Sequence, residues 1–286
     1  MSSQKKRTGS FGVVISIIAI VIVIFSFCSK KRHTQQQAAT PNENPSVAEG
    51  SYSLIFGDSF NRALASQDDL GLSILIAVDV SGSMKDYPSE KGNRAQEKYK
   101  IASESLNEIV TFLSEFYSEN IVDQGITLKL GLMKFSDSVT EIYPLTEMNN
   151  QRFEELRRLT SNRNLFLPEG ATAIGKTLET GSEILAQSGT IFNSLIIITD
   201  GENTTGIEPA PVLSAIVENK NNKSTPDFPV FTNDILVSFV AFDIALNYFN
   251  RLETIGARIT SAGNKAELNE SLKNLFLADI TKLEGN

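Results

Sequence analysis

The pattern of apolar and polar positions separates an N-terminal apolar run from a long region where short apolar runs alternate with helical periodicity. Residues 72–78 form an apolar run broken only by Ser73, which predicts a strand buried on both faces of a sheet. Across residues 99–116 the apolar side chains recur at helical spacing, which predicts a helix with one buried face. Alternation over 126–132, a turn, and a second extended run to Tyr143 predict a β-hairpin.

The remaining apolar runs complete an alternating series of strands and helices. They predict helices near 174–185, 245–252 and 268–283, and strands near 195–199, 235–242 and 258–261. This order is typical of an α/β fold with a doubly wound, mostly parallel sheet and helices on both faces. The hairpin supplies one antiparallel edge strand. We expect this Rossmann-like domain to occupy residues 70–284, with 219–233 as a long surface loop.

The N-terminal apolar run, residues 11–28, contains no charged side chain and has lysines and arginines on both sides. At 1.5 Å per residue, a helix over this run is about 27 Å long, which is enough to cross the bilayer core. We therefore expect a basic head at 1–10, a single-pass transmembrane anchor at 11–28 and a polar juxtamembrane linker at 29–69.

The orientation of this anchor is not decided by the positive-inside rule, because three basic residues lie on each side. The short basic head before the apolar run looks like an uncleaved export signal, which favours an extracytoplasmic domain. Lipidation at Cys28, the single cysteine, is the alternative mode of anchoring. Against it, Phe27 stands where a lipoprotein signal has a small residue.

The distribution of charge along the chain argues against a nucleic-acid partner. The net charge is −8, but residues 1–33 hold six of the 26 basic residues and no acid. The remainder therefore carries 20 basic and 34 acidic residues. A domain this acidic repels phosphate backbones, so we expect no nucleic-acid partner.

Three polar clusters fall at predicted strand ends or at a helix start, where open α/β sheets bind their ligands. They are Asp79 to Ser83 (DVSGS), Gly170 to Thr172 (GAT) and Thr199 to Asn203 (TDGEN). The candidate metal ligands in them are two carboxylates and three hydroxyls: Asp79, Asp200, Ser81, Ser83 and Thr172. Hard oxygen donors without imidazole or thiolate indicate a hard cation, with Mg²⁺ preferred and Ca²⁺ or Mn²⁺ as alternatives.

The order D-x-S-G-S, G-x-T and T-D-G-E resembles the von Willebrand factor A domain and its metal-ion-dependent adhesion site. The resemblance implies that Ser81, Ser83 and Thr172 are hydroxyl ligands, while Asp79 and Asp200 act mostly through metal-bound waters. It also implies that a partner's Asp or Glu side chain is the open ligand of the metal. The turn 135–137 is similar to the turn after the family's second strand.

A nucleotide site is the rival interpretation of the same region. The stretch 170–177, GATAIGKT, fits the pattern G-x-x-x-x-G-K-[ST], and Asp200 ends an apolar run as a magnesium-holding acid would. That pattern needs a strand directly before its first glycine, whereas NRNLFLPE stands there. Helical spacing places Lys176 opposite the buried stripe, near Glu179, which predicts a solvated lysine.

The sequence therefore predicts a membrane-anchored, non-catalytic domain that binds a protein partner through a divalent cation, in cell adhesion or cell-envelope assembly. By resemblance alone, a MoxR-type AAA+ ATPase system is a candidate partner. The alternative is an enzyme, either a metal-assisted phosphohydrolase or a nucleotide hydrolase that uses GATAIGKT. The single histidine, His33, lies in the linker, so the domain offers no serine–histidine pair.

Overall fold

The computed structural model describes residues 69–89, 96–122, 126–221 and 234–284. The chain divides into two compact units, 1–49 and 50–286, and every described residue belongs to the second. The predicted basic head, the membrane anchor, Cys28 and the linker up to residue 68 lie outside the described residues. Within the described part, no helix combines the length and hydrophobicity that crossing a bilayer requires.

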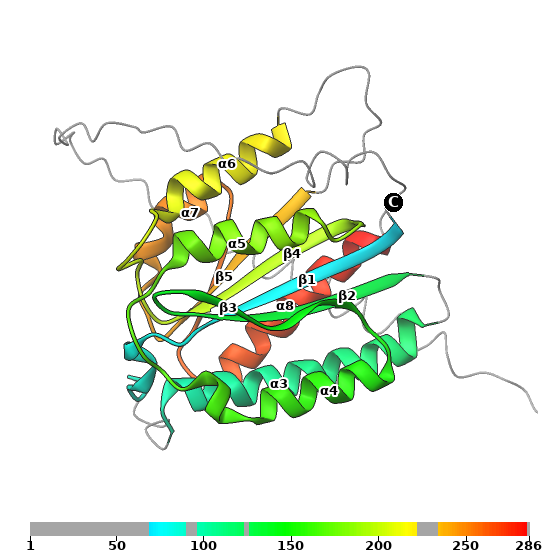
Figure 1. Cartoon of the computed structure of the whole chain (residues 1–286), viewed down its shortest axis with the longest axis horizontal. Coiled ribbons are helices and arrows are strands. Elements are labelled where there is room, and N and C mark those ends of the chain that lie inside the picture. Colours follow the sequence, from blue (N-terminus) through cyan, green and yellow to red (C-terminus); the bar gives the residue numbers. More distant parts are fainter. Residues whose placement is uncertain (1–68, 90–95, 123–125, 222–233, 285–286) are drawn as a thin grey trace, which may run out of the picture. The chain divides into compact units, whose positions relative to one another are not determined.

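A single six-stranded sheet forms the centre of the described domain (Figure 1). Its order is β3-β2-β1-β4-β5-β6, and every neighbouring pair is parallel except the β2–β3 hairpin. The strands are β1 (Asp69–Asp79), β2 (Thr127–Phe135), β3 (Val139–Glu147), β4 (Thr190–Thr199), β5 (Asp234–Phe242) and β6 (Arg258–Ala262). The prediction of a mostly parallel sheet with one antiparallel edge strand is therefore confirmed.

Helices cover both faces of this sheet, as expected for a doubly wound fold (Figure 1). One face packs against α3 (Lys98–Phe116), α4 (Asn150–Ser161) and α8 (Lys265–Glu284), and the other against α5 (Ile174–Ala186), α6 (Pro209–Asn221) and α7 (Asn250–Ile255). Short helical turns are η1 (Gly82–Lys85), η2 (Tyr117–Ile121), η3 (Arg163–Phe166) and η4 (Leu246–Phe249).

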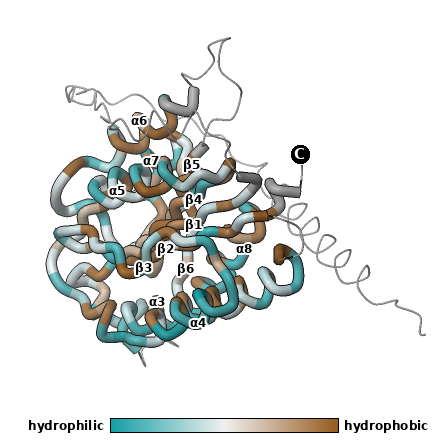
Figure 2. Tube along the Cα trace, turned by 45° about the vertical axis from the view of Figure 1, so that its right-hand side comes forward, coloured by the Kyte–Doolittle hydropathy of each residue, from teal (hydrophilic) through white to brown (hydrophobic). Residues whose placement is uncertain are grey.

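The central strand shows why two layers of helices are needed. In β1, Ile74 and Ile76 enter the core under α3 and α8, whereas Leu75 and Ala77 enter the core under α5 and α6. Alternate side chains of a strand point to opposite faces, so an apolar run must be covered on both sides. Figure 2 shows hydrophobic stretches along the central strands and many hydrophilic positions on α3 and α4.

The sequence analysis did not predict two of the helices, α4 and α6. The charged helix α4 buries only Phe153, Leu156 and Thr160, and its start is capped by the Asn149 side chain, which accepts a 3.0 Å hydrogen bond from the Arg152 amide. Helix α6 begins at Pro209, a residue that fits the first turn of a helix. Both starts carry a capping signal, but their apolar stripes are too short to stand out by periodicity.

Several predicted bounds were also wrong. The segment predicted as one helix near 245–252 is the turn η4 followed by the short helix α7. The strand predicted at 195–199 begins five residues earlier, at Thr190, because a buried polar group of Ser188, Thr190 and Asn193 lies at its start. Helix α6 runs to Asn221, so the start of the predicted loop at 219–233 is helical, and residues 222–233 lie outside the described part.

Leu106 of α3 is fully buried in the core, and we expect its replacement by alanine to destabilise the domain strongly. Leu106→Ala removes apolar contacts and leaves a cavity, which should lower the free energy of unfolding by about 2–5 kcal/mol. Leu167 is the matched control because its side chain is 54% exposed, so Leu167→Ala should change stability by about 0.5 kcal/mol or less. Urea unfolding of both variants measures this, and equal losses would contradict the described core.

Candidate metal centre

The site begins with Asp79, the last residue of the central strand β1. Its carboxylate is fully buried. One oxygen, Oδ1, accepts a 2.7 Å hydrogen bond from the Ser81 amide, and the other, Oδ2, accepts a 2.6 Å bond from the Thr199 hydroxyl at the end of β4. Asp79 therefore joins the ends of two neighbouring parallel strands and starts the turn that follows β1.

The environment of Asp79 disfavours its charge. Burial raises the pKa of Asp79 from 3.8 to about 6, although the hydrogen bonds from Thr199 and Ser81 act in the opposite direction. The negative charge of Asp200 adds to the increase. A buried carboxylate with a raised pKa gains from a nearby cation, because the cation favours its charged form.

The loop after β1 turns two serine hydroxyls toward one point. Ser81 Oγ and Ser83 Oγ lie 3.2 Å apart. The loop is held on both sides, since the Gly82 amide donates to the carbonyl of Gly170 at 3.0 Å and the Val80 amide donates to the carbonyl of Phe135 at 2.8 Å. These backbone bonds fix the loop to the end of β2 and to the segment before α5.

Asp200 enters the site from the end of β4. It is nearly buried, and its Oδ1 accepts a 2.7 Å hydrogen bond from the Ser83 hydroxyl. The pairing of β1 with β4 aligns Val78 with Ile198, which brings the loops after the two strands side by side. Asp79, Ser81, Ser83 and Asp200 thus form one connected group of oxygen atoms.

Thr172 joins this group from the loop before α5. A Cβ atom built on Gly201 would lie 3.4 Å from Thr172 Oγ1 and 3.9 Å from Ser83 Oγ, so the two hydroxyls approach the same glycine. The backbone of Thr172 is fixed because its amide donates to the Thr204 hydroxyl at 2.8 Å and its carbonyl accepts from the Thr204 amide at 2.9 Å. All five predicted ligands therefore lie at the same edge of the sheet.

The β2–β3 turn supports the Thr172 loop. Asp137 Oδ1 accepts a 3.1 Å hydrogen bond from the Ala171 amide, and the Ser136 carbonyl accepts one from the Ala173 amide at 2.9 Å. Gly170 has a φ of +76°, and a Cβ there would lie 1.9 Å from Asp137 Oδ2. This glycine is needed for the close approach of the two loops.

Lys98 is a charged group at the site that the sequence did not single out. It is the first residue of α3, and its ammonium lies 3.0 Å from Asp200 Oδ2 and 3.1 Å from Asp243 Oδ2. Burial acts to lower the pKa of Lys98, but the two carboxylates outweigh it and raise the pKa, so this side chain stays charged. Several lysines lie nearby in the sequence, and no pattern distinguishes Lys98 among them.

The nucleotide-like features of GATAIGKT have other roles. The segment before Gly170 contains η3 and an irregular stretch, where a nucleotide loop would follow a strand. A Cβ on Gly175 would lie 1.9 Å from the Ile207 carbonyl oxygen, so this glycine allows the close approach of the chain before α6. Lys176 is exposed and pairs with Glu179 at 2.6 Å, as the helical spacing predicted.

The geometry of the oxygen cluster suits a small hard cation. Mg²⁺ binds six oxygens at about 2.0–2.1 Å, so neighbouring ligands in an octahedron lie about 3 Å apart. The 3.2 Å separation of the Ser81 and Ser83 hydroxyls fits two such positions. In the described part of the chain, no group of three or more His, Cys, Asp or Glu side chains is arranged to hold a metal, so a cation at this edge would need hydroxyl ligands.

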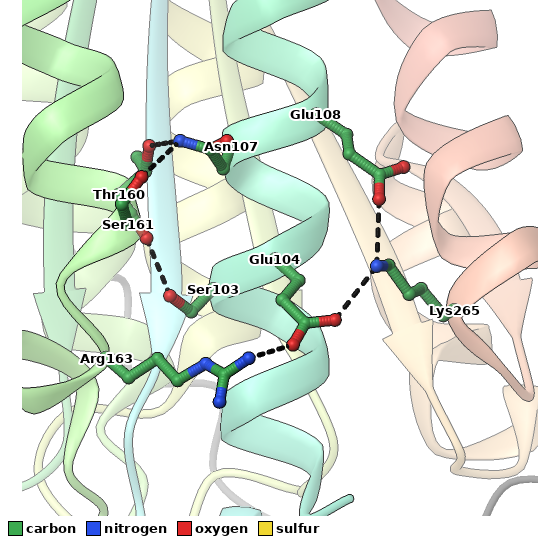
Figure 3. A pocket seen from close by; sticks show the side chains of 8 residues that line it. All are labelled: Ser103, Glu104, Asn107, Glu108, Thr160, Ser161, Arg163 and Lys265. Atoms are coloured by element: carbon green, nitrogen blue, oxygen red, sulfur yellow. Dashed lines mark hydrogen bonds and ion pairs between the residues drawn. The ribbon is translucent and has the colours of Figure 1, made fainter.

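A second polar hollow lies on the α3 side of the sheet (Figure 3). It has a volume of about 250 Å³, and its charged groups neutralise one another. Glu104 binds both Arg163 and Lys265, and Lys265 also lies 2.8 Å from Glu108. These pairs hold α3 against η3 and α8, which gives the hollow a structural role.

The raised pKa of Asp79 predicts how the metal-free domain responds to pH. Between about pH 4 and 6 the folded domain binds more protons than the unfolded chain, so its free energy of unfolding falls as the pH rises through this window. Asp79→Asn removes this dependence and should stabilise the metal-free domain at pH 7 by up to about 3 kcal/mol. Below about pH 4 the two proteins should converge.

Chemical denaturation in EDTA from pH 3.5 to 8 measures the effect. The same pH slope in wild type and Asp79→Asn would contradict the assignment of a buried, charge-disfavouring environment to Asp79.

Comparisons with known proteins agree with the fold described above. Residues 74–202 match the sequence profile of the von Willebrand factor type A domain. No curated protein matches the chain. A von Willebrand factor type A structure from Catenulispora acidiphila has 15% identity and a TM-score of 0.51, over 72% of this chain and 42% of that one.

Two further solved structures share the fold. A variant of the PilB minor pilin from Streptococcus sanguinis has 16% identity and a TM-score of 0.52, over 74% of this chain and 62% of that one. BatB from Bacteroides thetaiotaomicron has 16% identity and a TM-score of 0.51, over 74% of this chain and 98% of that one. At these identities the likeness concerns the fold, and the chain spans less than two thirds of the length of the first two proteins. Residues 74–202 therefore match the von Willebrand factor type A family in sequence, and the described domain has the same fold as a solved structure of that family.

Proposed function

We propose that this domain binds a protein partner through a divalent cation held by Ser81, Ser83 and Thr172, and that the cation takes an Asp or Glu side chain of the partner as its open ligand. The observation that carries the proposal is the pair of serine hydroxyls 3.2 Å apart, next to the Asp200 carboxylate at the carboxyl edge of the sheet. Mg²⁺ is the preferred cation, with Ca²⁺ and Mn²⁺ as alternatives.

The donor set explains why an external carboxylate is required. Hydroxyl ligands are neutral, so they leave most of the positive charge on the cation. Both oxygens of Asp79 are hydrogen-bonded within the chain. Its role in the proposed site is therefore to supply negative charge and to shape the loop, and not to bind the metal directly. A hard cation in these surroundings remains attractive to one more anionic oxygen.

The surface around the site suits contact with a protein. Five large apolar side chains are strongly exposed in the described part, and four of them follow strand ends at this edge of the sheet, in loops or in the turn η4: Tyr87, Leu167, Leu246 and Tyr248. Exposed aromatic and apolar side chains that gather on one face are typical of protein interfaces. The acidic remainder of the chain would repel an acidic partner, so the cation supplies the local attraction.

The cellular setting follows from the N-terminal sequence and from the fold relatives. We propose a single-pass anchor at 11–28, with the domain outside the cytoplasm and lipidation at Cys28 as the alternative. A role in adhesion or in cell-envelope assembly is supported by the likeness in fold to a minor pilin and to BatB. Association with a MoxR-type AAA+ ATPase system rests on family resemblance alone.

We propose further that the domain is not itself a catalyst. Lys176 is exposed and paired with Glu179, which argues against a role in holding a nucleotide phosphate beside Asp200. A phosphohydrolase that used Asp79 as nucleophile would need this carboxylate to reach its substrate, whereas it is fully buried and bonded at both oxygens. Both enzyme alternatives therefore have weaker support than cation-dependent binding.

Removal of one ligand hydroxyl should abolish cation-dependent binding and leave the fold intact. We expect Thr172→Ala to weaken Mg²⁺ binding at least about tenfold, because the site loses one direct ligand. Thr254→Ala is the matched control, since Thr254 is exposed and its hydroxyl bonds only within α7, to Asn250. Calorimetric titration with Mg²⁺ measures the affinities, and circular dichroism checks the fold.

Partner capture from a membrane extract, with Mg²⁺ and with EDTA, tests the interaction itself. Wild type and Lys176→Ala should both capture the partner in Mg²⁺ and lose it in EDTA, because Lys176 has no part in the proposed site. Capture that persists in EDTA would refute the proposal. ATP binding that disappears in Lys176→Ala would favour the nucleotide alternative instead.

A further inference from the structure

The Lys98 ammonium forms a built-in cation beside the predicted metal site. It lies between two carboxylates, 3.0 Å from Asp200 Oδ2 and 3.1 Å from Asp243 Oδ2. The exposed fractions of the three side chains are 9%, 0% and 8%, so the group is almost closed to solvent. Charges that are desolvated in this way interact much more strongly than charges on an open surface.

Asp243 is held firmly in its place at the end of β5. It is the one non-glycine residue with positive φ in the described part of the chain, at +56°. Its Oδ1 accepts a 3.0 Å hydrogen bond from the Ser89 amide, and its own amide donates to the Ala262 carbonyl at 2.7 Å. A residue kept in this sparsely populated conformation is fixed by its surroundings, so the ammonium has a rigid second partner.

The two oxygens of Asp200 consequently face different cations. Oδ1 accepts from the Ser83 hydroxyl on the side of the oxygen cluster, and Oδ2 is bound to Lys98. A metal ion in the cluster can reach Oδ1 directly or through a water, but bidentate binding by Asp200 would break the ion pair with Lys98. Lys98 therefore restricts Asp200 to contact with the metal through one oxygen, Oδ1.

We propose that Lys98 is a positioning residue of the metal centre, which keeps Asp200 in a single-oxygen orientation and offsets part of its charge. As a result the site binds its cation less tightly but leaves that cation more attractive to a partner's carboxylate. This inference rests on the proposed function, because it concerns the same cation.

The net charge of the cluster explains why Lys98 affects the binding of the cation and the binding of a partner's carboxylate in opposite directions. Asp79, Asp200 and Asp243 bring three negative charges, and Lys98 brings one positive charge. A divalent cation then makes the cluster neutral. Loss of the lysine charge leaves an excess negative charge that attracts metal and repels an incoming carboxylate, whereas loss of the Asp243 charge does the reverse.

The first experiment is calorimetric titration of the domain with Mg²⁺ alone. We expect Lys98→Gln to bind Mg²⁺ on the order of tenfold more tightly than wild type, and Asp243→Asn to bind it on the order of tenfold more weakly. Asparagine tolerates the left-handed conformation at position 243, so this variant keeps the loop. Lys176→Gln, which removes an exposed lysine paired with Glu179, is the matched control and should behave as wild type.

The second experiment uses acetate as the carboxylate probe on Mn²⁺-loaded protein, with water proton relaxation as the signal. The order of acetate affinities among these proteins should be the reverse of the order of their Mg²⁺ affinities. Acetate should bind Lys98→Gln more weakly than wild type, and it should bind Asp243→Asn more tightly. A merely structural role for Lys98 predicts a different result, because a loosened site would bind both metal and acetate more weakly in each variant.

The outcomes separate this inference from the proposed function. If wild type binds no Mg²⁺, the proposed function fails and the inference fails with it. If wild type binds Mg²⁺ but Lys98→Gln shows equal or lower affinity, the role of Lys98 is refuted and the metal centre stands. If Lys98→Gln does not fold, Asp243→Asn decides, and equal or tighter Mg²⁺ binding in that variant refutes the inference.

Discussion

The fully buried carboxylate of Asp79 is the constraint on which the candidate metal site depends. A charge at the end of the central strand is costly to bury, and the Ser81 amide and the Thr199 hydroxyl offset part of that cost. These two bonds also determine the shape of the site. The first starts the turn that presents the serine hydroxyls, and the second fixes the end of β4 immediately before Asp200. A single side chain therefore sets the relative positions of two loops that lie far apart in the sequence.

The supporting loops show how a misleading motif arises from ordinary packing requirements. In GATAIGKT, Gly170 allows contact with Asp137 of the β2–β3 turn, and Gly175 allows contact with the backbone of Ile207. The Thr177 hydroxyl donates to the Ala173 carbonyl of the same helix. Each position that matches the nucleotide pattern thus has a local reason unrelated to phosphate. Thr172, which the nucleotide pattern leaves variable, is the residue that reaches the oxygen cluster.

The charges at the site form a balanced group within an acidic domain. Lys98 pairs with both Asp200 and Asp243, so these two buried carboxylates have a compensating positive charge within the fold. The close approach of the Ser81 and Ser83 hydroxyls is a contact between the two serines themselves, and Ser83 also donates to Asp200 Oδ1. The two oxygens of Asp200 thus have separate roles: Oδ2 takes part in the ion pair, and Oδ1 lies on the side of the proposed cation.

Much of the architecture could be predicted from the sequence because apolar periodicity and the rules of α/β topology act along the whole chain. The apolar run at 72–78 and the alternation at 126–132 sufficed for a central parallel strand and an antiparallel edge. The helices α4 and α6 were missed because their buried stripes are short and their stability comes from packing against the sheet. The apolar periodicity of a helix was weak where tertiary contacts supply most of the free energy that stabilises the helix.

The five candidate oxygen side chains could be proposed from the sequence, since they lie directly at strand ends or at a helix start, and parallel strands bring such ends together. The three-dimensional arrangement was needed to show which oxygen of Asp200 faces the serine hydroxyls, and that Lys98 and Asp243 share its surroundings. Lys98 and Asp200 are separated by 102 positions. Such a contact depends on how the fold places the start of α3 beside the ends of β4 and β5, and on the left-handed conformation of Asp243, which no pattern of neighbouring residues encodes.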